Sequence, residues 1–166
     1  MTALAVDTGG RTLTAFGRTI PCEIGRAGAC PASEKREGDG MTPLGSWPLR
    51  AVLLRPDRIA WHPLHLPWRW LRPGDGWSDD PSDPTYNRPV RHPHGFSAEQ
   101  LWRADGLYDV IATLGHNDTP IVPGRGSAIF LHVMGDGATE GCVALDRVEL
   151  LELLPMLAPG DQLEII

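Results

Sequence analysis

The chain has 166 residues, a length that fits one domain with one hydrophobic core, so we treat residues 1–166 as a single unit. Its formal net charge of −6 argues against a nucleic-acid or anionic-membrane partner, because both need a basic face. Nineteen glycines and 16 prolines favour short elements joined by turns over a helical bundle. We therefore expect a mainly β fold with short helices, most simply a sandwich of largely antiparallel strands.

The N-terminal segment and the cysteines bear on the compartment. Residues 1–7 have no positively charged start and no sustained apolar run, and no stretch is long enough for a membrane span. We expect a cytoplasmic protein, or a periplasmic one if this N-terminus is incomplete. Cys22 and Cys30 lack the paired spacing of a disulfide framework or a zinc site, so we expect both to be reduced and structural.

The first half of the chain predicts a series of strands. Thr2–Val6, Arg11–Phe16 and Thr19–Glu23 are short β-prone segments separated by glycines. Thr42–Gly45 contains Pro43 and Gly45 and predicts a tight turn, which leads into a strand over Trp47–Arg55.

The region from Pro56 to Pro93 is irregular and rich in aromatic residues and histidines. Four tryptophans could cover a small core or form a face for stacking sugars, and the first reading is favoured. These are Trp61, Trp68, Trp70 and Trp77. Two histidine pairs, His62 with His65 and His92 with His94, are interrupted by prolines that break the regular element a metal site would need. We expect neither a metal nor another cofactor.

Tyr86-Asn87-Arg88 is a candidate for substrate contact, because the arginine fork suits a carboxylate. The alternative is a surface arginine that pairs with Asp79 or Asp80.

Two further segments carry polar candidates. Ser97–Gln100 has the spacing of a capping box and predicts a short helix, and Tyr108–Leu114 predicts a core strand. His116 follows that strand and is either a second acid/base group or a loop hydrogen-bonding residue. Arg125 lies between two glycines and points either into a cleft or to the surface.

The strongest chemical signal lies in residues 127–145. Ser127–Val133 is an apolar, β-prone segment that predicts a buried strand with His132 at its end. Cys142 follows ten positions later, after a spacer that can turn at Gly135 and Gly137, so the thiol can return beside the imidazole. A neighbouring imidazolium lowers the pKa of a thiol and produces a nucleophile. A buried core cysteine and a satisfied strand-end histidine remain the alternative.

The C-terminal part predicts a helix and a last strand. Asp146 and Glu149 have capping-box spacing, and an apolar face of Val148, Leu151, Leu154 and Met156-Leu157 is predicted to pack on the sheet. Gln162–Ile166 predicts the closing strand.

These motifs together resemble the L,D-transpeptidase (YkuD-like) catalytic domain. The resemblance covers most of the chain, from about Gly25 to the end. The matching segments are His132 followed by Thr139-Glu140-Gly141-Cys142, residues 37–45 (EGDGMTPLG), residues 76–81 with Tyr86-Asn87-Arg88, and residues 117–132. Three features depart from the family pattern: Glu140 replaces a common histidine, Ala144 replaces a common arginine or asparagine, and the spacer between His132 and Cys142 is short.

The resemblance implies a β-sandwich with the cysteine and histidine in a groove. It implies that Cys142 is the nucleophile and His132 its base, with Thr139 a candidate hydroxyl for orienting the imidazole. Backbone amides of Gly141 and Cys142 would hold the oxyanion. Candidate substrate contacts are Arg88, Tyr86, Asn87, Arg125, His116 and Glu140.

The implied substrate is a peptidoglycan stem tetrapeptide, attacked at its third residue with loss of the terminal D-Ala. Resolution of the thioester by water gives an L,D-carboxypeptidase acting on muropeptides in recycling, the outcome favoured by the expected compartment. Resolution by an amine gives an L,D-transpeptidase. Carbapenem-type β-lactams are the implied covalent inhibitors. A non-catalytic peptidoglycan-binding module and a metallohydrolase built on the histidine pairs are the more distant alternatives.

Overall fold

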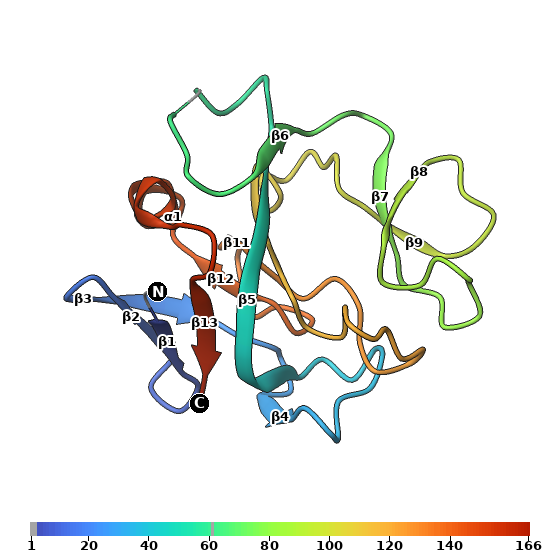
Figure 1. Ribbon diagram of the computed structural model, residues 1–166, viewed down its shortest axis with the longest axis horizontal. Coiled ribbons are helices and arrows are strands. Elements are labelled where there is room, and N and C mark those ends of the chain that lie inside the picture. Colours follow the sequence, from blue (N-terminus) through green and yellow to red (C-terminus); the bar gives the residue numbers. More distant parts are fainter. Residues whose placement is uncertain (1–2, 61) are drawn as a thin grey trace.

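Strands dominate the computed structural model, which describes residues 3–60 and 62–166 (Figure 1). The strands are β1 Ala3–Asp7, β2 Thr12–Ala15, β3 Arg18–Glu23, β4 Ala29–Pro31, β5 Thr42–Leu54, β6 Trp68–Trp70, β7 Asp75–Ser78, β8 Pro89–Arg91, β9 Ala98–Gln100, β10 Val110–Leu114, β11 Phe130–Val133, β12 Val143–Leu145 and β13 Gln162–Ile165. One α-helix, α1 (Arg147–Leu153), continues into a 3-10 turn over Leu154–Met156. The predicted mainly β class with short helices is confirmed.

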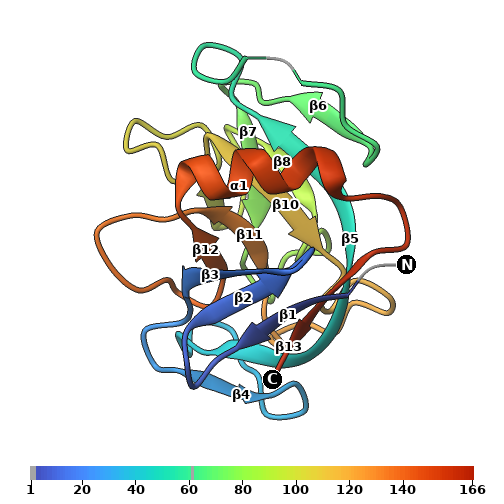
Figure 2. The same cartoon turned by 90° about the vertical axis from the view of Figure 1, so that its left-hand side faces the viewer.

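The larger sheet closes on itself. In the described part of the chain its hydrogen-bonded order is β10-β11-β12-β3-β2-β1-β13-β5-β4, with β6 added at β5, and β10 also pairs with β5. The two halves of this path therefore face each other across a shared core, with α1 lying along one side (Figure 2). Strands β1 and β13 are parallel neighbours, with Ala3 opposite Gln162 and Val6 opposite Ile165.

Strand β5 joins the two halves. Gly45–Pro48 pairs with β13, whereas Leu49–Leu54 pairs with β10, so one 13-residue strand serves both. The turn predicted at Thr42–Gly45 is wrong, because these residues already belong to β5. Thr42 instead donates its amide to Gly28 and accepts the Gly25 amide on its hydroxyl, and this pairing with the β4 edge replaces a local turn.

Helix α1 begins where the sequence predicts. The Asp146 carboxylate accepts the Val148 amide at 2.9 Å. The predicted apolar face is partly wrong, since Val148 is 60% and Met156 48% exposed, while Leu150 and Leu153 are buried. The buried residues Leu150, Leu153, Leu154 and Leu157 are spaced i, i+3, i+4 and i+7, so they form one face, and Val148 and Met156 lie outside it.

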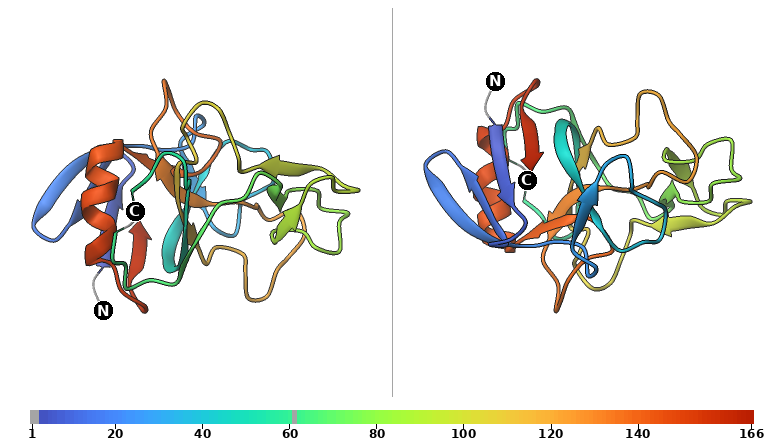
Figure 3. Two further views of the ribbon diagram at one scale, coloured as in Figure 1. Left: turned by 90° about the horizontal axis from the view of Figure 1, so that it is seen from above. Right: turned by 90° about the horizontal axis from the view of Figure 1, so that it is seen from below.

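A small sheet of β8, β7 and β9 lies at the end of the molecule opposite α1 (Figure 3). The helix predicted at Ser97–Gln100 is wrong, since Ala98–Gln100 is β9 and pairs with β7. The capping-box spacing is present, but the backbone groups of this segment bond to the β7 edge instead.

Two apolar clusters fill the interior. The larger one lies between the halves of the main sheet, with Trp68 and Trp70 packed against it. The smaller one includes Tyr108, Phe130 and Cys142 and carries Trp77 at its side. The described tryptophans of this region thus cover the core, while Trp61 lies outside the described residues.

Three further findings concern the cysteines, the helices and possible metal ligands of the described residues. Cys22 and Cys30 are free and buried. None of the helices in residues 3–60 and 62–166 has the length and apolar character needed to cross a membrane. Within the same residues, no group of three or more His, Cys, Asp or Glu side chains is arranged to hold a metal ion.

Candidate active site

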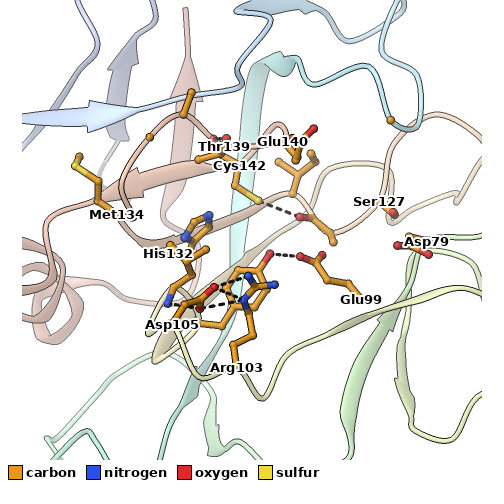
Figure 4. A pocket seen from close by; sticks show the side chains of 18 of the residues that line it. Asp79, Glu99, Arg103, Asp105, Ser127, His132, Met134, Thr139, Glu140 and Cys142 are labelled. Carbon is orange, nitrogen blue, oxygen red and sulfur yellow. Dashed lines mark hydrogen bonds and ion pairs between the residues drawn. The ribbon is translucent and has the colours of Figure 1, made fainter.

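The strand pairing brings His132 and Cys142 to one cavity. β11 runs parallel to β12, with Leu131 opposite Val143, so Cys142 lies just before β12 and beside the strand that carries His132. Both side chains line a cavity of about 740 Å³ at the edge of the smaller apolar cluster (Figure 4). β10, which the sequence predicts as a core strand, pairs with β11 on its other side.

The Cys142 thiol is buried and held as a neutral group. Its sulfur donates to the Ala128 carbonyl at 3.1 Å and accepts the Phe130 amide at 3.3 Å, and the residue is 7% exposed. Burial raises the pKa of the thiol to about 12, with a further contribution from the negative charge of Glu99. Ala128 itself has a left-handed φ of 53°, a conformation that costs a non-glycine residue about 1 kcal/mol or more.

His132 is oriented by a backbone carbonyl. Its Nδ1 lies 2.8 Å from the Val133 oxygen, and because a carbonyl only accepts, Nδ1 carries the proton and Nε2 is left as the base. The Tyr108 ring packs edge-on against the imidazole at 5.2 Å. Burial lowers the pKa of His132 to about 4, although the hydrogen bond to Val133 acts in the opposite direction.

These two pKa shifts differ from the expectation that an imidazolium activates the thiol at rest. With the thiol at about 12 and the imidazole at about 4, the proton belongs on sulfur and both groups are neutral. The arrangement supports proton transfer only when a bound substrate displaces the thiol from the Ala128 carbonyl or stabilises the ion pair.

Thr139 and Gly141 shape the backbone beside the thiol. The Thr139 hydroxyl donates to the Cys142 carbonyl at 2.7 Å and accepts the Gly141 amide at 3.1 Å, so it orients this loop rather than the imidazole. Of the two amides expected to hold an oxyanion, that of Gly141 is thereby engaged, and the Cys142 amide is the remaining candidate. Gly141 has φ +139°, and a Cβ there would lie 2.9 Å from the Met41 carbonyl oxygen.

Tyr86 and Asn87, predicted as substrate contacts, are buried and support the wall of the cavity. The Tyr86 hydroxyl donates to Glu37 and accepts the Gly126 amide at 3.0 Å. Asn87 accepts the Ala128 amide at 3.1 Å through its side-chain oxygen. Neither residue lines the cavity, so their contacts position residues 126–128 next to Cys142.

The other predicted contacts are dispersed. Arg88 lies at a second, shallower hollow, Arg125 donates to the Ser33 carbonyl, and His116 is buried against the Trp47 ring at 4.8 Å. These three lie outside the cavity lining. Glu140 does line it, 76% exposed, and its carboxylate accepts Arg26 Nε at 2.9 Å.

The cavity is also lined by a polar group around Tyr108 that no sequence pattern indicates. The Tyr108 hydroxyl donates to Glu99, and the Arg103 guanidinium lies 5.5 Å from the Tyr108 ring centroid while it pairs with Asp105 at 2.5 Å. In the sequence, Glu99 belongs to a segment with capping-box spacing, which predicts a helix. Only the pairing of β9 with β7 brings it to the cavity, so no local pattern could have found it.

A mainly β domain that presents a cysteine and an oriented histidine to one cavity has the layout of a thiol-dependent acyl-transfer catalyst. The family comparison agrees: the model of the YkuD family, the L,D-transpeptidase catalytic domain, matches residues 2–165, and the chain belongs to this family. Members of the family are cysteine-dependent L,D-transpeptidases, associated with acyl transfer on peptidoglycan. No curated protein matches the chain at a significant level.

Two of the solved structures that match the chain, with TM-scores above 0.5, show the same fold at low sequence identity. Bd1075 of Bdellovibrio bacteriovorus is 17% identical with a TM-score of 0.52, and the match covers 99% of this chain and 47% of that one. L,D-transpeptidase 3 of Mycobacterium tuberculosis is 14% identical with a TM-score of 0.51, over 99% and 60% of the two chains. LD transpeptidase LdtMt1 in complex with imipenem is 10% identical with a TM-score of 0.46, over 99% and 58%. The chain thus spans about half to three fifths of these proteins.

Proposed function

We propose that this protein is a thiol-dependent acyl transferase that acts on peptidoglycan stem tetrapeptides through a thioester on Cys142. One observation carries the proposal: the Cys142 thiol and a His132 ring whose Nδ1 is bound to a backbone carbonyl line the same cavity. Family membership supplies the substrate class. The cavity volume of about 740 Å³ is within the range of sites that enclose a small ligand.

The first half-reaction uses the two side chains in sequence. His132 Nε2 accepts the thiol proton, and the sulfur attacks the carbonyl carbon of the third residue of the stem. The Cys142 amide donates to the oxyanion of the tetrahedral intermediate. When the intermediate collapses, the C–N bond breaks, the leaving D-Ala amine takes the proton from His132, and the thioester remains.

The acceptor in the second half-reaction decides the name of the enzyme. Water gives an L,D-carboxypeptidase, which shortens the tetrapeptide of a muropeptide by its terminal D-Ala. A second candidate outcome, L,D-transpeptidation, is favoured by the carboxylates of Glu37, Asp79 and Glu99 in the cavity lining, because these suit an amine acceptor.

A product assay tests the proposal. The protein is incubated with disaccharide-tetrapeptide and the products are followed by mass: loss of one alanine without a dimer identifies the carboxypeptidase, whereas a cross-linked dimer or exchange with an added D-amino acid identifies the transpeptidase. Cys142→Ala and His132→Ala each reduce turnover by several orders of magnitude while the thermal unfolding transition is retained.

The assay also distinguishes an acyl transferase from a binding module and from a metallohydrolase. Binding of the muropeptide with no product from the unmodified protein would instead make it a binding module. Turnover that persists in Cys142→Ala but is abolished by a chelator would make it a metallohydrolase.

A further inference from the structure

One wall of the cavity is lined by acidic and hydroxyl side chains, and we name Glu37, Asp79, Glu99 and Ser127 the acidic corner. Its members come from four separate segments: the loop before β5, the residue after β7, β9, and the segment before β11. In Figure 4, Asp79 and Ser127 lie beyond Glu99 as seen from His132, so the corner and the catalytic pair face the same space.

The carboxylates of the acidic corner form no ion pair with any of the residues described. Both cations that line the cavity are engaged elsewhere: Lys35 pairs with Asp39 at 2.5 Å and Arg103 with Asp105 at 2.5 Å. Glu37 and Glu99 accept hydrogen bonds from tyrosine hydroxyls. Across residues 3–60 and 62–166, no ion pair neutralises any of the three carboxylates of the corner.

The three carboxylates are close enough to affect one another. Burial raises the pKa of Glu99, and the charges of Asp79 and Glu37 raise it further, against the lowering effects of the Tyr108 hydroxyl and Arg103. Like charges gathered in a partly desolvated cavity repel, and a bound cation relieves that repulsion.

Two buried oxygens in the corner accept no hydrogen bond in the described part of the chain. They are Asp79 Oδ1 and Ser127 Oγ, and Ser127 is only 8% exposed. The Tyr86 hydroxyl gives its proton to Glu37, so Ser127 can donate to the Tyr86 oxygen but receives no proton from it. Leaving such an atom unsatisfied costs about 1–3 kcal/mol, so a ligand that brings several N–H donors is favoured.

We propose that the acidic corner binds the protonated primary amine of an acyl acceptor and so directs the thioester toward aminolysis rather than hydrolysis. This inference rests on the proposed function and names the specificity determinants of its second step. An ammonium group offers three donors, which matches the unpartnered oxygens together with a carboxylate. A metal ion fits less well, because no metal-binding arrangement of His, Cys, Asp or Glu exists among the residues described.

The corner is placed for reaction with the thioester. Glu99 and Cys142 line the same cavity, and Glu99 accepts the hydroxyl of Tyr108, whose ring packs on His132. The charge of Glu99 also raises the pKa of the Cys142 thiol. The bound ammonium gives one proton to Glu99, and its nitrogen then attacks the thioester carbonyl. The C–S bond breaks, the nitrogen gives its second proton to the leaving thiolate through His132, and an amide forms. Glu99 afterwards releases its proton to solvent.

Binding is tested with a matched pair of probes on the Cys142→Ala protein, in which no thioester can form. The first probe is Nα-acetyl-lysine methylamide, which carries one ammonium group. The second is the same molecule acetylated on its side-chain nitrogen. Calorimetric titration is expected to detect the first probe and not the second. Asp79→Asn and Glu99→Gln should each weaken binding about 10-fold or more, the size of a charge-assisted hydrogen bond.

A control variant distinguishes binding by the acidic corner from attraction by the overall negative charge of the cavity lining. Asp136 also lines the cavity but is exposed and outside the corner, so Asp136→Asn removes the same charge and should leave the affinity for the ammonium probe unchanged. Ser127→Ala, which keeps all the charges, should weaken binding by removing one acceptor. Thermal unfolding of each variant shows whether a loss of affinity reflects a loss of fold.

The outcomes distinguish this inference from the proposed function. If the ammonium probe binds through the corner while stem tetrapeptide never acylates Cys142 in the unmodified protein, the proposed function fails and the amine site stands. If Cys142 is acylated but the probe fails to bind, or binds equally to Asp79→Asn and Glu99→Gln, the amine site is overturned. In the acylating enzyme, Glu99→Gln should lower the ratio of aminolysis to hydrolysis products at a fixed probe concentration.

Discussion

The raised pKa of the Cys142 thiol leads us to predict how fast this thiol is alkylated. With the pKa of the thiol raised to about 12, its ionised fraction at pH 7.5 is about 3 × 10⁻⁵, against about one tenth for an ordinary thiol of pKa about 8.5. The difference is about 3,000-fold in thiolate. A more basic thiolate is intrinsically more nucleophilic, which restores roughly 30-fold. We therefore expect alkylation about 100-fold slower than for a free thiol, before any steric effect of burial.

The assay is timed labelling with iodoacetamide between pH 6 and 10, followed by mass spectrometry of the Cys142 peptide. The same peptide labelled in urea provides the reference rate. The labelling rate of the folded protein should rise about tenfold per pH unit with no plateau in this range.

A plateau below pH 7 would refute the reasoning, because it would show a thiolate–imidazolium pair already formed at rest. The His132→Asn variant sharpens the test. Because His132 is neutral in the resting protein, its replacement should change the labelling rate by no more than about twofold.

Three further predictions concern stability and are measured by denaturant unfolding. Gly141→Ala should lower the free energy of unfolding by about 2–3 kcal/mol, because φ is +139° and the added Cβ meets a backbone oxygen at 2.9 Å, and a loss below 0.5 kcal/mol would contradict this. Asp109→Asn should cost about 2 kcal/mol, because this buried carboxylate pairs with two half-exposed arginines, and an unchanged midpoint would show that those pairs are screened. Burial lowers the pKa of both His132 and His116 from 6.5 to about 4, so the unfolded chain binds protons that the folded chain does not. Stability should fall as pH decreases below 6.5, by about 2 kcal/mol for each histidine at pH 5, and constant stability from pH 7 to 5 would count against these burials.

The sequence predicts those parts of the fold that local patterns determine. Alternating or apolar runs give most of the strands, and the Asp146 cap gives the start of α1. The motif around His132 and Cys142 indicates both the family and the cavity that these residues share.

Other features depend on contacts between distant segments, and the sequence pattern does not contain them. The spacing at Ser97–Gln100 suits a helix cap, but hydrogen bonds to β7 make the segment a strand and deliver Glu99 to the cavity. Asn87 has the polarity of a surface contact, yet it is buried and holds the Ala128 backbone.

The protonation states of Cys142 and His132 also depend on tertiary structure. A histidine near a cysteine suggests an activated thiol, but the sign of each pKa shift depends on burial, which no spacing encodes. The segment that precedes β10 places Tyr108 over His132, and the resulting desolvation keeps both reactive groups neutral.

Formation of an acyl-enzyme on Cys142 can be measured by mass spectrometry. The protein is mixed with disaccharide-tetrapeptide, quenched in acid at short times and analysed by intact mass and peptide mapping, with a carbapenem as a second acylating agent. We expect an adduct on Cys142 with the mass of the muropeptide minus its terminal alanine. Hydroxylamine should release this adduct, and the Cys142→Ala protein should not form it. Products without any adduct on Cys142, or an adduct confined to Cys22 or Cys30, would contradict it.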